Sequence, residues 1–321
     1  MILILSEDRD ETTSSVIDWL HKFKAPYIRI NQEDTVAVNF CTPGSFELLI
    51  NEEVLIHSKS ITSFWYRRGF FASFKGHFSG NDTYLLSSIR NHLSAELIAL
   101  NDFLFFLLKG IPGLGNYKNS HLNKIEQLNR AQALGIKIPD TMITSKKEVL
   151  LEFILKHNSV ITKSIDSPLT IAVESKNYMT YTEAIDEDFA RNLPDFFAPS
   201  LFQANIIKRY EIRSFYLDGD FYSMAIFSQK NDQTAVDFRK YDFKVPNRTT
   251  KFQLPKFTED KLRKLIEYYE LDTCSVDLIV TNSMDFVFLE INPVGQFGMV
   301  SMPCNYQLEK KVALSLINKG K

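Results

Sequence analysis

The chain begins with short apolar runs separated by an amphipathic segment. Residues 2–5 are apolar, residues 12–23 carry apolar side chains at helical spacing, and Tyr27–Asn31 is a second short run. This order predicts a strand, a helix and a strand, a repeat that is typical of an α/β layer. Further strands are expected at 46–49 and at Ser63–Tyr66.

A long helical pattern covers residues 82–108. Its apolar residues recur every three or four positions, at Leu86, Ile89, Leu93, Leu97, Leu100 and Leu104. The segment 109–119 then concentrates glycine, proline and asparagine, which favour turns. We therefore expect a domain boundary near residue 115.

The middle of the chain mixes helical and strand patterns. Ser120 is expected to cap a helix that ends at Gly135, which can take a left-handed conformation without strain. The pattern then predicts a strand after Pro139, a helix at 146–156, and strands at 160–163, 169–173 and 201–206. This part of the chain is α+β in character.

The last third of the chain contains paired strands. Residues 211–229 alternate around Asp218 and Gly219, which can form a tight turn, so we expect a long antiparallel hairpin. The remaining pattern predicts a helix at 262–269, strands at 275–281 and 285–291, and a helix at 305–317.

Composition and charge narrow the class of protein. A chain of 321 residues with 45% hydrophobic content exceeds one compact domain, so two or three domains are expected. The 37 Lys and Arg nearly balance the 39 Asp and Glu, which argues against a protein that mainly binds nucleic acid. A membrane span of roughly 20 apolar residues and a signal peptide are both missing from the pattern. Cys41, Cys274 and Cys304 are too few and too widely spaced for a disulfide framework, so we expect a cytoplasmic protein.

The strongest chemical signal lies in the two strands near the carboxyl end. Asp277 lies on the first strand, and Glu290 and Asn292 lie two positions apart on the second, so these two share one face. If the strands pair antiparallel, the three side chains converge and offer the hard oxygen ligands that Mg²⁺ prefers. The alternative is that both acids are ordinary surface residues.

The segments around these residues, SVDLIV and LEINPVGQF, resemble the metal-binding end of the ATP-grasp superfamily. NSHLNKIEQLNRAQALGIKIPDTMIT and LFQANIIKRYEIRSFYLDGDFYS are similar to its central region, its hinge and its hairpin. Together with VDFRKYD they most resemble the graspetide synthetases, or microviridin-type ligases. SFWYRRG and NPVGQFGMVSMPCNYQLEKKVA are similar to the grasp-with-spasm peptide maturases within that branch.

This resemblance implies a fold, an activity and a partner. The fold would be α/β and α+β, with a Rossmann-like N-terminal domain at 1–115, a small central domain at 116–202 and a C-terminal domain at 203–321. The activity would be that of an ATP- and Mg²⁺-dependent peptide macrocyclase. It would act on the leader and core of a ribosomally synthesised precursor peptide, and the enzyme would be a homodimer.

The resemblance also implies roles for single residues. Lys124 and Lys163 match the two lysines that contact phosphates, although each could be an ordinary solvated lysine. The segment Gln203, Ala204, Asn205 and Ile206 matches the hinge that reads adenine, and Glu211 is a candidate for the ribose hydroxyls. Ala204 stands where the family often has an acid, and SIDSPLTIA after Lys163 lacks the glycines of the family's phosphate-covering loop.

Two arginines match positions close to the reacting groups. Arg213 corresponds to the arginine near the γ-phosphate and the acyl phosphate, where a planar, permanently charged group suits phosphoryl transfer. A cross-strand ion pair is its alternative role. Arg239 corresponds to a contact of the substrate carboxylate or phosphate, or else lies in a solvated loop. Arg67 and Arg68, next to two aromatic residues, are weaker candidates for binding an acidic peptide.

Two other functions are compatible with the same motifs. The chain could be an ATP-grasp ligase that joins amino acids or extends a protein terminus. It could also be a non-catalytic adaptor that binds a nucleotide or a peptide, which Ala204 and the missing glycines would favour.

Overall fold

The computed structural model describes residues 1–71, 78–80, 82–173, 176–229 and 246–321, and the chain forms two compact units. The first unit combines residues 1–120 with 296–301 and 307–321. The second unit combines residues 121–295 with 302–306. The last helix of the chain therefore belongs to the first unit. The division at residues 115 and 202 stays a prediction.

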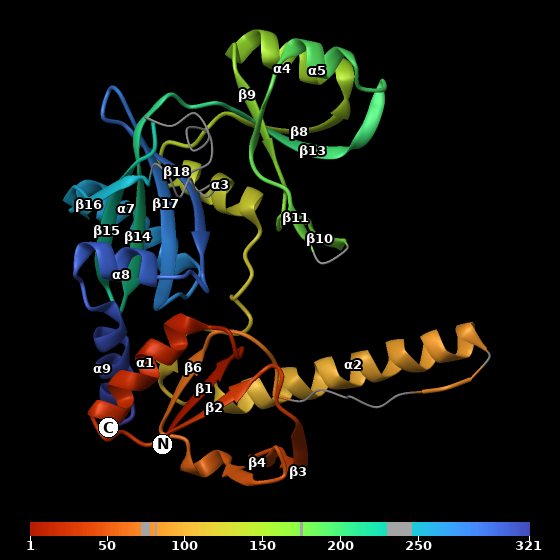
Figure 1. The fold of residues 1–321 in the computed structure, drawn as a ribbon, viewed down its shortest axis with the longest axis vertical. Coiled ribbons are helices and arrows are strands. Elements are labelled where there is room, and N and C mark those ends of the chain that lie inside the picture. The colour runs from red at the N-terminus through yellow and green to blue at the C-terminus, as the bar shows by residue number, and fades with distance from the viewer. Residues whose placement is uncertain (72–77, 81, 174–175, 230–245) are drawn as a thin grey trace. The chain divides into compact units, whose positions relative to one another are not determined.

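The first unit is built on a parallel sheet with the strand order β2-β1-β6-β7 (Figure 1). Helices α1 and α9 pack against each other, and the last turns of α2 bury Phe105 beside Phe64. This arrangement confirms the predicted β-α-β pattern. Among the described residues, no helix has the length and apolarity that a bilayer span requires. The elements are β1 (Ile2–Ser6), α1 (Glu11–Lys22), β2 (Tyr27–Asn31), β6 (Ser63–Tyr66), α2 (Thr83–Leu108), β7 (Gly113–Leu114) and α9 (Leu308–Lys319).

A small antiparallel sheet is also part of the first unit. It contains β3 (Val36–Thr42), β4 (Ser45–Ile50) and β5 (Val54–His57), followed by the short helix η1 (Ser58–Ser60). The pattern predicted only the middle strand, because the flanking strands carry many polar and exposed residues. Phe46 is fully buried and packs against Phe71, which ties this sheet to the core.

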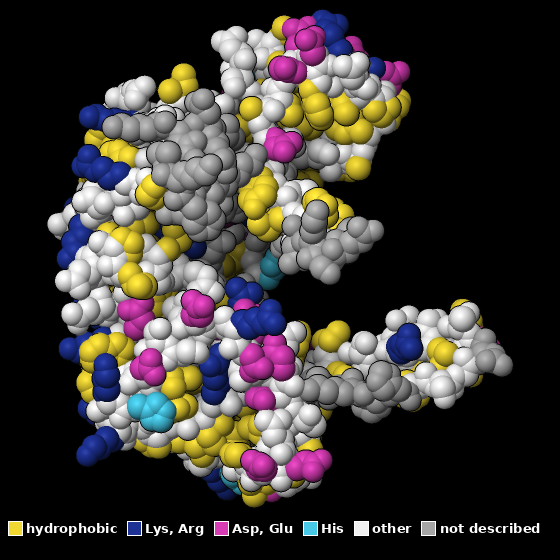
Figure 2. All heavy atoms as spheres, in the orientation of Figure 1, with side chains coloured by type: hydrophobic (Ala, Val, Ile, Leu, Met, Phe, Trp, Pro, Cys, Tyr) yellow, Lys and Arg dark blue, Asp and Glu magenta, His cyan; other side chains and the backbone are white. Residues whose placement is uncertain are grey.

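The second unit begins with helix α3 (Lys124–Ala133) and a sheet with the order β12-β9-β13-β8. Leu150 and Ile154 of α4 pack on Phe202 and cover one face of this sheet. Apolar side chains remain exposed elsewhere on this lobe, among them Ile143 and Phe196 (Figure 2). The elements are β8 (Thr141–Lys146), α4 (Lys147–His157), β9 (Val160–Lys163), β10 (Thr170–Val173), β11 (Lys176–Met179), β12 (Glu183–Ile185), α5 (Glu187–Arg191) and β13 (Phe196–Ala204).

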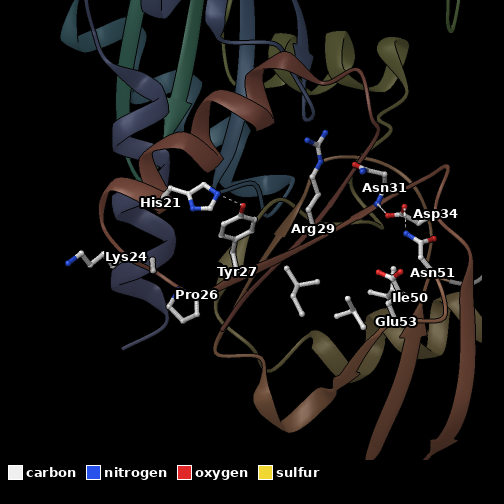
Figure 3. Close-up of a pocket in the computed structure, with 13 residues that line it drawn as sticks. His21, Lys24, Pro26, Tyr27, Arg29, Asn31, Asp34, Ile50, Asn51 and Glu53 are labelled. Atoms are coloured by element: carbon white, nitrogen blue, oxygen red, sulfur yellow. Dashed lines mark hydrogen bonds between the residues drawn. The ribbon is translucent and has the colours of Figure 1, made fainter.

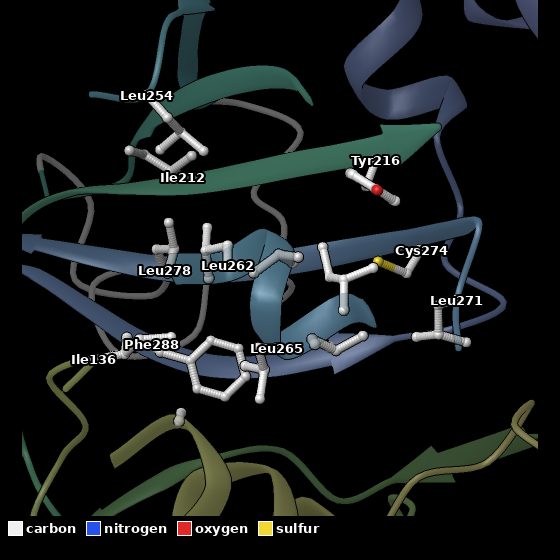
Figure 4. Close-up of a cluster of buried hydrophobic side chains, with 14 of the residues drawn as sticks. Ile136, Ile212, Tyr216, Leu254, Leu262, Leu265, Leu271, Cys274, Leu278 and Phe288 are labelled. Carbon is white, nitrogen blue, oxygen red and sulfur yellow. The ribbon is translucent and has the colours of Figure 1, made fainter. Parts of the chain in front are cut away.

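A five-stranded antiparallel sheet, in the order β16-β15-β14-β17-β18, completes the second unit. Its predicted hairpin turns at Asp218 and Gly219 as expected. One face packs on α7, so that Ile212 and Leu278 meet Leu262 in the main core (Figure 4). The elements are β14 (Lys208–Leu217), β15 (Asp220–Phe227), β16 (Arg248–Phe252), α7 (Lys256–Tyr268), β17 (Thr273–Thr281) and β18 (Phe286–Asn292).

A β-bulge at Leu289 decides which face of this sheet Glu290 occupies. Leu278 lies opposite Phe288, whereas Asp277, the next residue, lies opposite Glu290. Leu289 is therefore one extra residue in β18. Since side chains alternate between the faces of a strand, regular pairing would place Glu290 on the same side as the buried Phe288. The bulge moves Glu290 to the opposite side, which is the side of Asp277.

Two predicted helix starts are wrong. Ser120 does not cap α3, because Asn123 accepts hydrogen bonds from the N–H groups of Ile125 and Glu126 and begins the helix instead. The last helix begins at Leu308 rather than at 305, because Asn305 and Gln307 both have a positive φ that breaks a helical path. A short helix that the pattern missed, α8 (Gly298–Cys304), precedes it.

We expect deletion of Leu289 to be tolerated. Phe288 and Glu290 then become neighbours in a regular strand, so they lie on opposite faces and Glu290 stays on the side of Asp277. The cost should be small compared with the roughly 3–5 kcal/mol of an uncompensated buried carboxylate. Urea denaturation of the deletion variant measures the change in the free energy of unfolding.

The variant Leu289→Met is the matched control, because it keeps the residue count and nearly the same volume. Its cost should stay below about 1.5 kcal/mol. A loss of about 3–5 kcal/mol in the deletion variant alone would show that Glu290 had turned into the core, against the register described above.

Candidate active site

A row of charged side chains crosses the face of the large sheet that lies away from α7. Arg213 on β14 is directly opposite Asp277 on β17, and Asp277 is directly opposite Glu290 on β18. Arg213 Nη1 lies 2.5 Å from Asp277 Oδ2. The buried Nε of the same guanidinium has no hydrogen-bond partner among the described residues. The arginine therefore forms the cross-strand ion pair that was its alternative role, within the predicted site.

Asn292 and Lys124 complete this group of side chains. Asn292 Nδ2 donates to Asp277 Oδ2 at 3.3 Å and to Glu290 Oε1 at 3.2 Å. Lys124, the first residue of α3, places its Nζ 3.5 Å from Glu290 Oε2. We call Lys124, Arg213, Asp277, Glu290 and Asn292 the charged cluster. The five residues come from four elements, α3, β14, β17 and β18.

Solvent reaches the charged cluster only in part. The side chain of Arg213 is 11% exposed and that of Lys124 is 23% exposed, so their charges are weakly screened. The loop after Asn292 packs tightly on β17, because a Cβ on Gly295 would lie 2.3 Å from Ser275 Oγ. Glycine is required there by this close approach. The loop thus holds the end of β18 against its neighbour.

The cluster has the right donors for a magnesium ion. Asp277 and Glu290 supply carboxylates, and Asn292 supplies an amide oxygen once its side chain turns over, because its nitrogen now faces both acids. No group of three Asp, Glu, His or Cys side chains that could bind a metal occurs among the described residues. Two carboxylates, one amide and phosphate oxygens from a nucleotide are nevertheless a usual set for Mg²⁺.

Glu211 occupies a second, buried ion pair on the same face, two residues before Arg213. It is 6% exposed, contacts Lys208 Nζ, and accepts a hydrogen bond from Ser228 Oγ at 3.2 Å. Burial raises the pKa of Glu211, and the contact with Lys208 opposes this rise. A ribose hydroxyl would therefore have to compete with partners that the carboxylate already has.

The hinge segment ends β13 and enters the following loop. The side chain of Gln203 is buried and donates to Thr141 Oγ1 at 2.8 Å. The N–H of Ala204 donates to Asp140 O, and the N–H of Asn205 donates to Ser159 O. Since the protein already uses these two N–H groups, adenine would have to be read by other groups of the segment, such as Ile206.

The other predicted residues are not all in the charged cluster. Lys163 ends β9 opposite Leu201, on the other sheet of the second unit. Arg239 lies outside the described residues. In the first unit, Arg67 is 3% exposed and pairs with Asp10 at 3.3 Å, so its suggested role in binding a peptide is wrong. Arg68 is more exposed and pairs with Glu7.

A hollow of about 710 Å³ in the first unit contains none of the predicted site residues (Figure 3). Its polar groups bind one another. The Tyr27 hydroxyl lies 2.7 Å from His21 Nε2, and Asp34 accepts hydrogen bonds from Asn51 Nδ2 and the N–H of Asn31. This internal pairing leaves these groups little capacity for a polar ligand.

Two buried polar residues beside the site, Lys208 and Gln127, were not expected from the sequence. Both are less than 9% exposed. Lys208 carried no recognisable signal, because lysine is usually a surface residue. Gln127 lies one helical turn after Lys124, on the same face as the apolar Leu128 and Ala131, and a polar residue at such a position is a signal.

Replacing Lys208 with Met should destabilise the protein, and more so at high pH. Without the ammonium group of Lys208, the side chain of Glu211 can stay buried at low cost only when it carries a proton. Because its pKa in the folded state is raised, stability is retained below the ordinary value of 4.5 and is lost as the pH rises. The loss near neutral pH should be about 3–5 kcal/mol.

Thermal unfolding at about pH 5 and about pH 8 measures this effect. The exposed Lys264 provides the control Lys264→Met, which should unfold like wild type at both values. A loss that did not depend on pH would mean that Glu211 is not charged in the native protein.

Comparison with known proteins adds to this geometry. No family model and no curated protein matches the chain. A RiPP-associated ATP-grasp ligase of Chryseobacterium gregarium, solved in complex with ADP, and a leader and core peptide, is 25% identical with a TM-score of 0.82, over 99% of this chain and 96% of that chain. The macrocyclase MdnC of Microcystis aeruginosa MRC, bound with the precursor peptide MdnA, is 24% identical with a TM-score of 0.81, over 99% of both chains.

A third structure, the ATP-grasp ligase PsnB complexed with minimal precursor, Mg, and ADP, is 15% identical with a TM-score of 0.73. It covers 99% of this chain, and this chain covers 98% of it. The likeness extends over both units and includes the sheet that carries the charged cluster. The predicted α/β and α+β architecture is confirmed, and the chain has the fold of the ATP-grasp ligases.

Proposed function

We propose that the protein is an ATP-dependent macrocyclase of a ribosomally made precursor peptide. The observation that carries this proposal is the charged cluster, in which two carboxylates, an amide and two cations meet on one face of the sheet. It is supported by the fold shared with ligases whose structures contain ADP and peptides. The peptide partner would comprise a leader and a core.

The reaction begins with transfer of the γ-phosphoryl group of ATP to an Asp or Glu side chain of the core. A Thr or Ser hydroxyl, or a Lys amine, then attacks the acyl phosphate, forming an ester or amide and releasing phosphate. Each link therefore removes one water from the peptide and converts one ATP to ADP and phosphate. The protein must keep water away from the acyl phosphate, which would otherwise hydrolyse.

The charged cluster suits this chemistry because its side chains can replace one another, as ion-pair partners, with phosphate groups and a metal ion. Arg213 and Lys124 now neutralise Asp277 and Glu290. With nucleotide bound, both cations can contact phosphate oxygens, and the buried Nε of Arg213 is a further donor. Asp277, Glu290 and Asn292 would hold Mg²⁺, which neutralises charge on the transferring phosphates. The attacking group gains mainly from being held close.

The remaining predicted residues enter as proposals. Lys163 would contact the phosphates, Gln203 to Ile206 would border the adenine, and Glu211 would lie near the ribose. Arg239 would contact the substrate carboxylate. The cytoplasm, where ATP is available, is the proposed location.

We expect Glu290→Ala and Asn292→Ala to abolish the ATP-dependent loss of water from the precursor. Both side chains lie on the solvent-accessible side of the sheet, so the fold should remain intact by circular dichroism. Mass spectrometry of the peptide supplies the measurement. A variant that still dehydrates its peptide at the wild-type rate would remove the metal role.

The same spectra separate the alternative functions. Macrocyclisation lowers the peptide mass by one water per link, whereas an amino-acid ligase would raise it by one residue. An adaptor would change neither the peptide mass nor the amount of ADP. A mass increase or an unchanged mass for wild type would therefore contradict the proposal.

We further propose that the enzyme is a homodimer in which α2 forms the contact. The surface of α2 in view carries few charges (Figure 2). Tyr84, Leu85 and Ile98 are 81%, 54% and 55% exposed, which is unusual for large apolar side chains on one helix. Burying them against a second copy would remove this apolar area from water.

Ile98→Glu should convert the dimer to a monomer. Because Ile98 is exposed in the single chain, a charge there costs nothing within the unit but cannot be buried against a partner. Sedimentation velocity measures the mass. Lys264→Glu, at an exposed residue of α7 and outside α2, is the control and should remain dimeric. A wild-type monomer at micromolar concentration would contradict the homodimer.

A further inference from the structure

Gln127 connects helix α3 to the outer edge of β18. It is 1% exposed, although its side chain is polar. The N–H of Ile291 donates to Gln127 Oε1 at 2.6 Å, and Gln127 Nε2 donates to the carbonyl oxygen of Ile291 at 3.2 Å. The amide thus satisfies both backbone groups of one residue, as a neighbouring strand would.

These contacts are needed because β18 is the last strand of its sheet. Backbone groups on the outer edge have no strand partner, and leaving a buried group unpaired costs about 1–3 kcal/mol. A backbone bond from Phe288 N–H to Lys137 O closes the same edge a little earlier. Gln127 closes it at Ile291, beyond the bulge.

The position of Ile291 gives this bond its importance. Ile291 lies between Glu290 and Asn292, so fixing its N–H and carbonyl fixes the backbone from which both side chains project. Gln127 also lies three residues after Lys124, on the same helical face. One amide therefore holds the helix that carries the cation at a constant distance from the strand that carries the acid.

We infer that Gln127 is a positioning residue of the active site, which sets the geometry of the Mg²⁺-nucleotide site through β18 and α3 without touching the nucleotide. This inference rests on the proposed function, because it assigns Gln127 to the site formed by Lys124, Glu290 and Asn292. The bulge selects the face that Glu290 and Asn292 occupy, and Gln127 holds them there.

Only glutamine fits this position among residues of similar size. Glutamate would keep an acceptor for the Ile291 N–H but would lose the donor to its carbonyl, and it would add a second negative charge near Glu290. Asparagine is one methylene shorter and cannot span the same gap. Methionine fills the volume with neither bond.

The test compares Gln127→Met with wild type in the full-length protein. Calorimetric titration with ADP at a series of Mg²⁺ concentrations, well below the melting temperature, measures nucleotide binding without any peptide. We expect the half-saturating Mg²⁺ concentration to rise at least about tenfold, or about 1.4 kcal/mol. Hydrogen exchange of the Ile291 amide should also become faster. The exposed Gln132 on the same helix provides the control Gln132→Met, which should behave like wild type.

Two results would overturn the inference. The first is a Gln127→Met protein that melts at a lower temperature but binds Mg·ADP like wild type, because the residue would then be only structural. If that variant does not fold, Gln127→Glu replaces it in the same titration, and wild-type binding by this variant is the second result.

Failure of the proposed function is recognised separately. A wild-type protein that binds Mg·ADP but never dehydrates a peptide would contradict the macrocyclase proposal alone. A wild-type protein that does not bind Mg·ADP would overturn both.

Discussion

The charged cluster depends on a change of phase within one strand. Side chains of a regular strand alternate between two faces, and β18 needs Phe288 in the core and Glu290 outside it. These two demands conflict in a regular strand, because the residues are two positions apart. A β-bulge that leaves Leu289 without a cross-strand partner resolves the conflict, and the pairing of Glu290 and Asn292 with the face of Asp277 follows from it.

The charges of the site are arranged so that they can change partners. Asp277 is paired with Arg213, and Glu290 is paired with Lys124. This pairing avoids isolated charges in a partly buried site, which would be costly. A triphosphate offers new partners to the two cations, and its magnesium ion offers a new partner to the two carboxylates. The polar groups are therefore held in place before the ligand binds, which reduces the cost of ordering them.

Packing contacts and one side-chain amide hold the strands of the charged cluster in place. Helix α7 and the main core pack on the face of the large sheet opposite the charged cluster and keep the sheet rigid. The tight packing of Gly295 on Ser275 holds the end of β18 from one side, and the Gln127 amide holds it from the other. The side chains that make these supporting contacts carry no charge. They act by excluding alternative positions of the backbone rather than by touching a ligand.

Much of this protein could be predicted from local patterns in its sequence. Strands such as Tyr27–Asn31 and Ser63–Tyr66, and the turn at Asp218 and Gly219, depend on short-range periodicity and turn chemistry. The proposed metal ligands could also be named, because two strands joined by a short turn must lie side by side. Local patterns failed at Ser120 and at 305–307, where the choice of a helix start depends on the whole neighbourhood. Only the tertiary structure decided the burial of Arg67 and the bond from Gln127 to Ile291, because each joins residues far apart in the chain. It also decided the bulge at Leu289, because the face of β18 that must be apolar depends on where the core packs, and no local pattern encodes that.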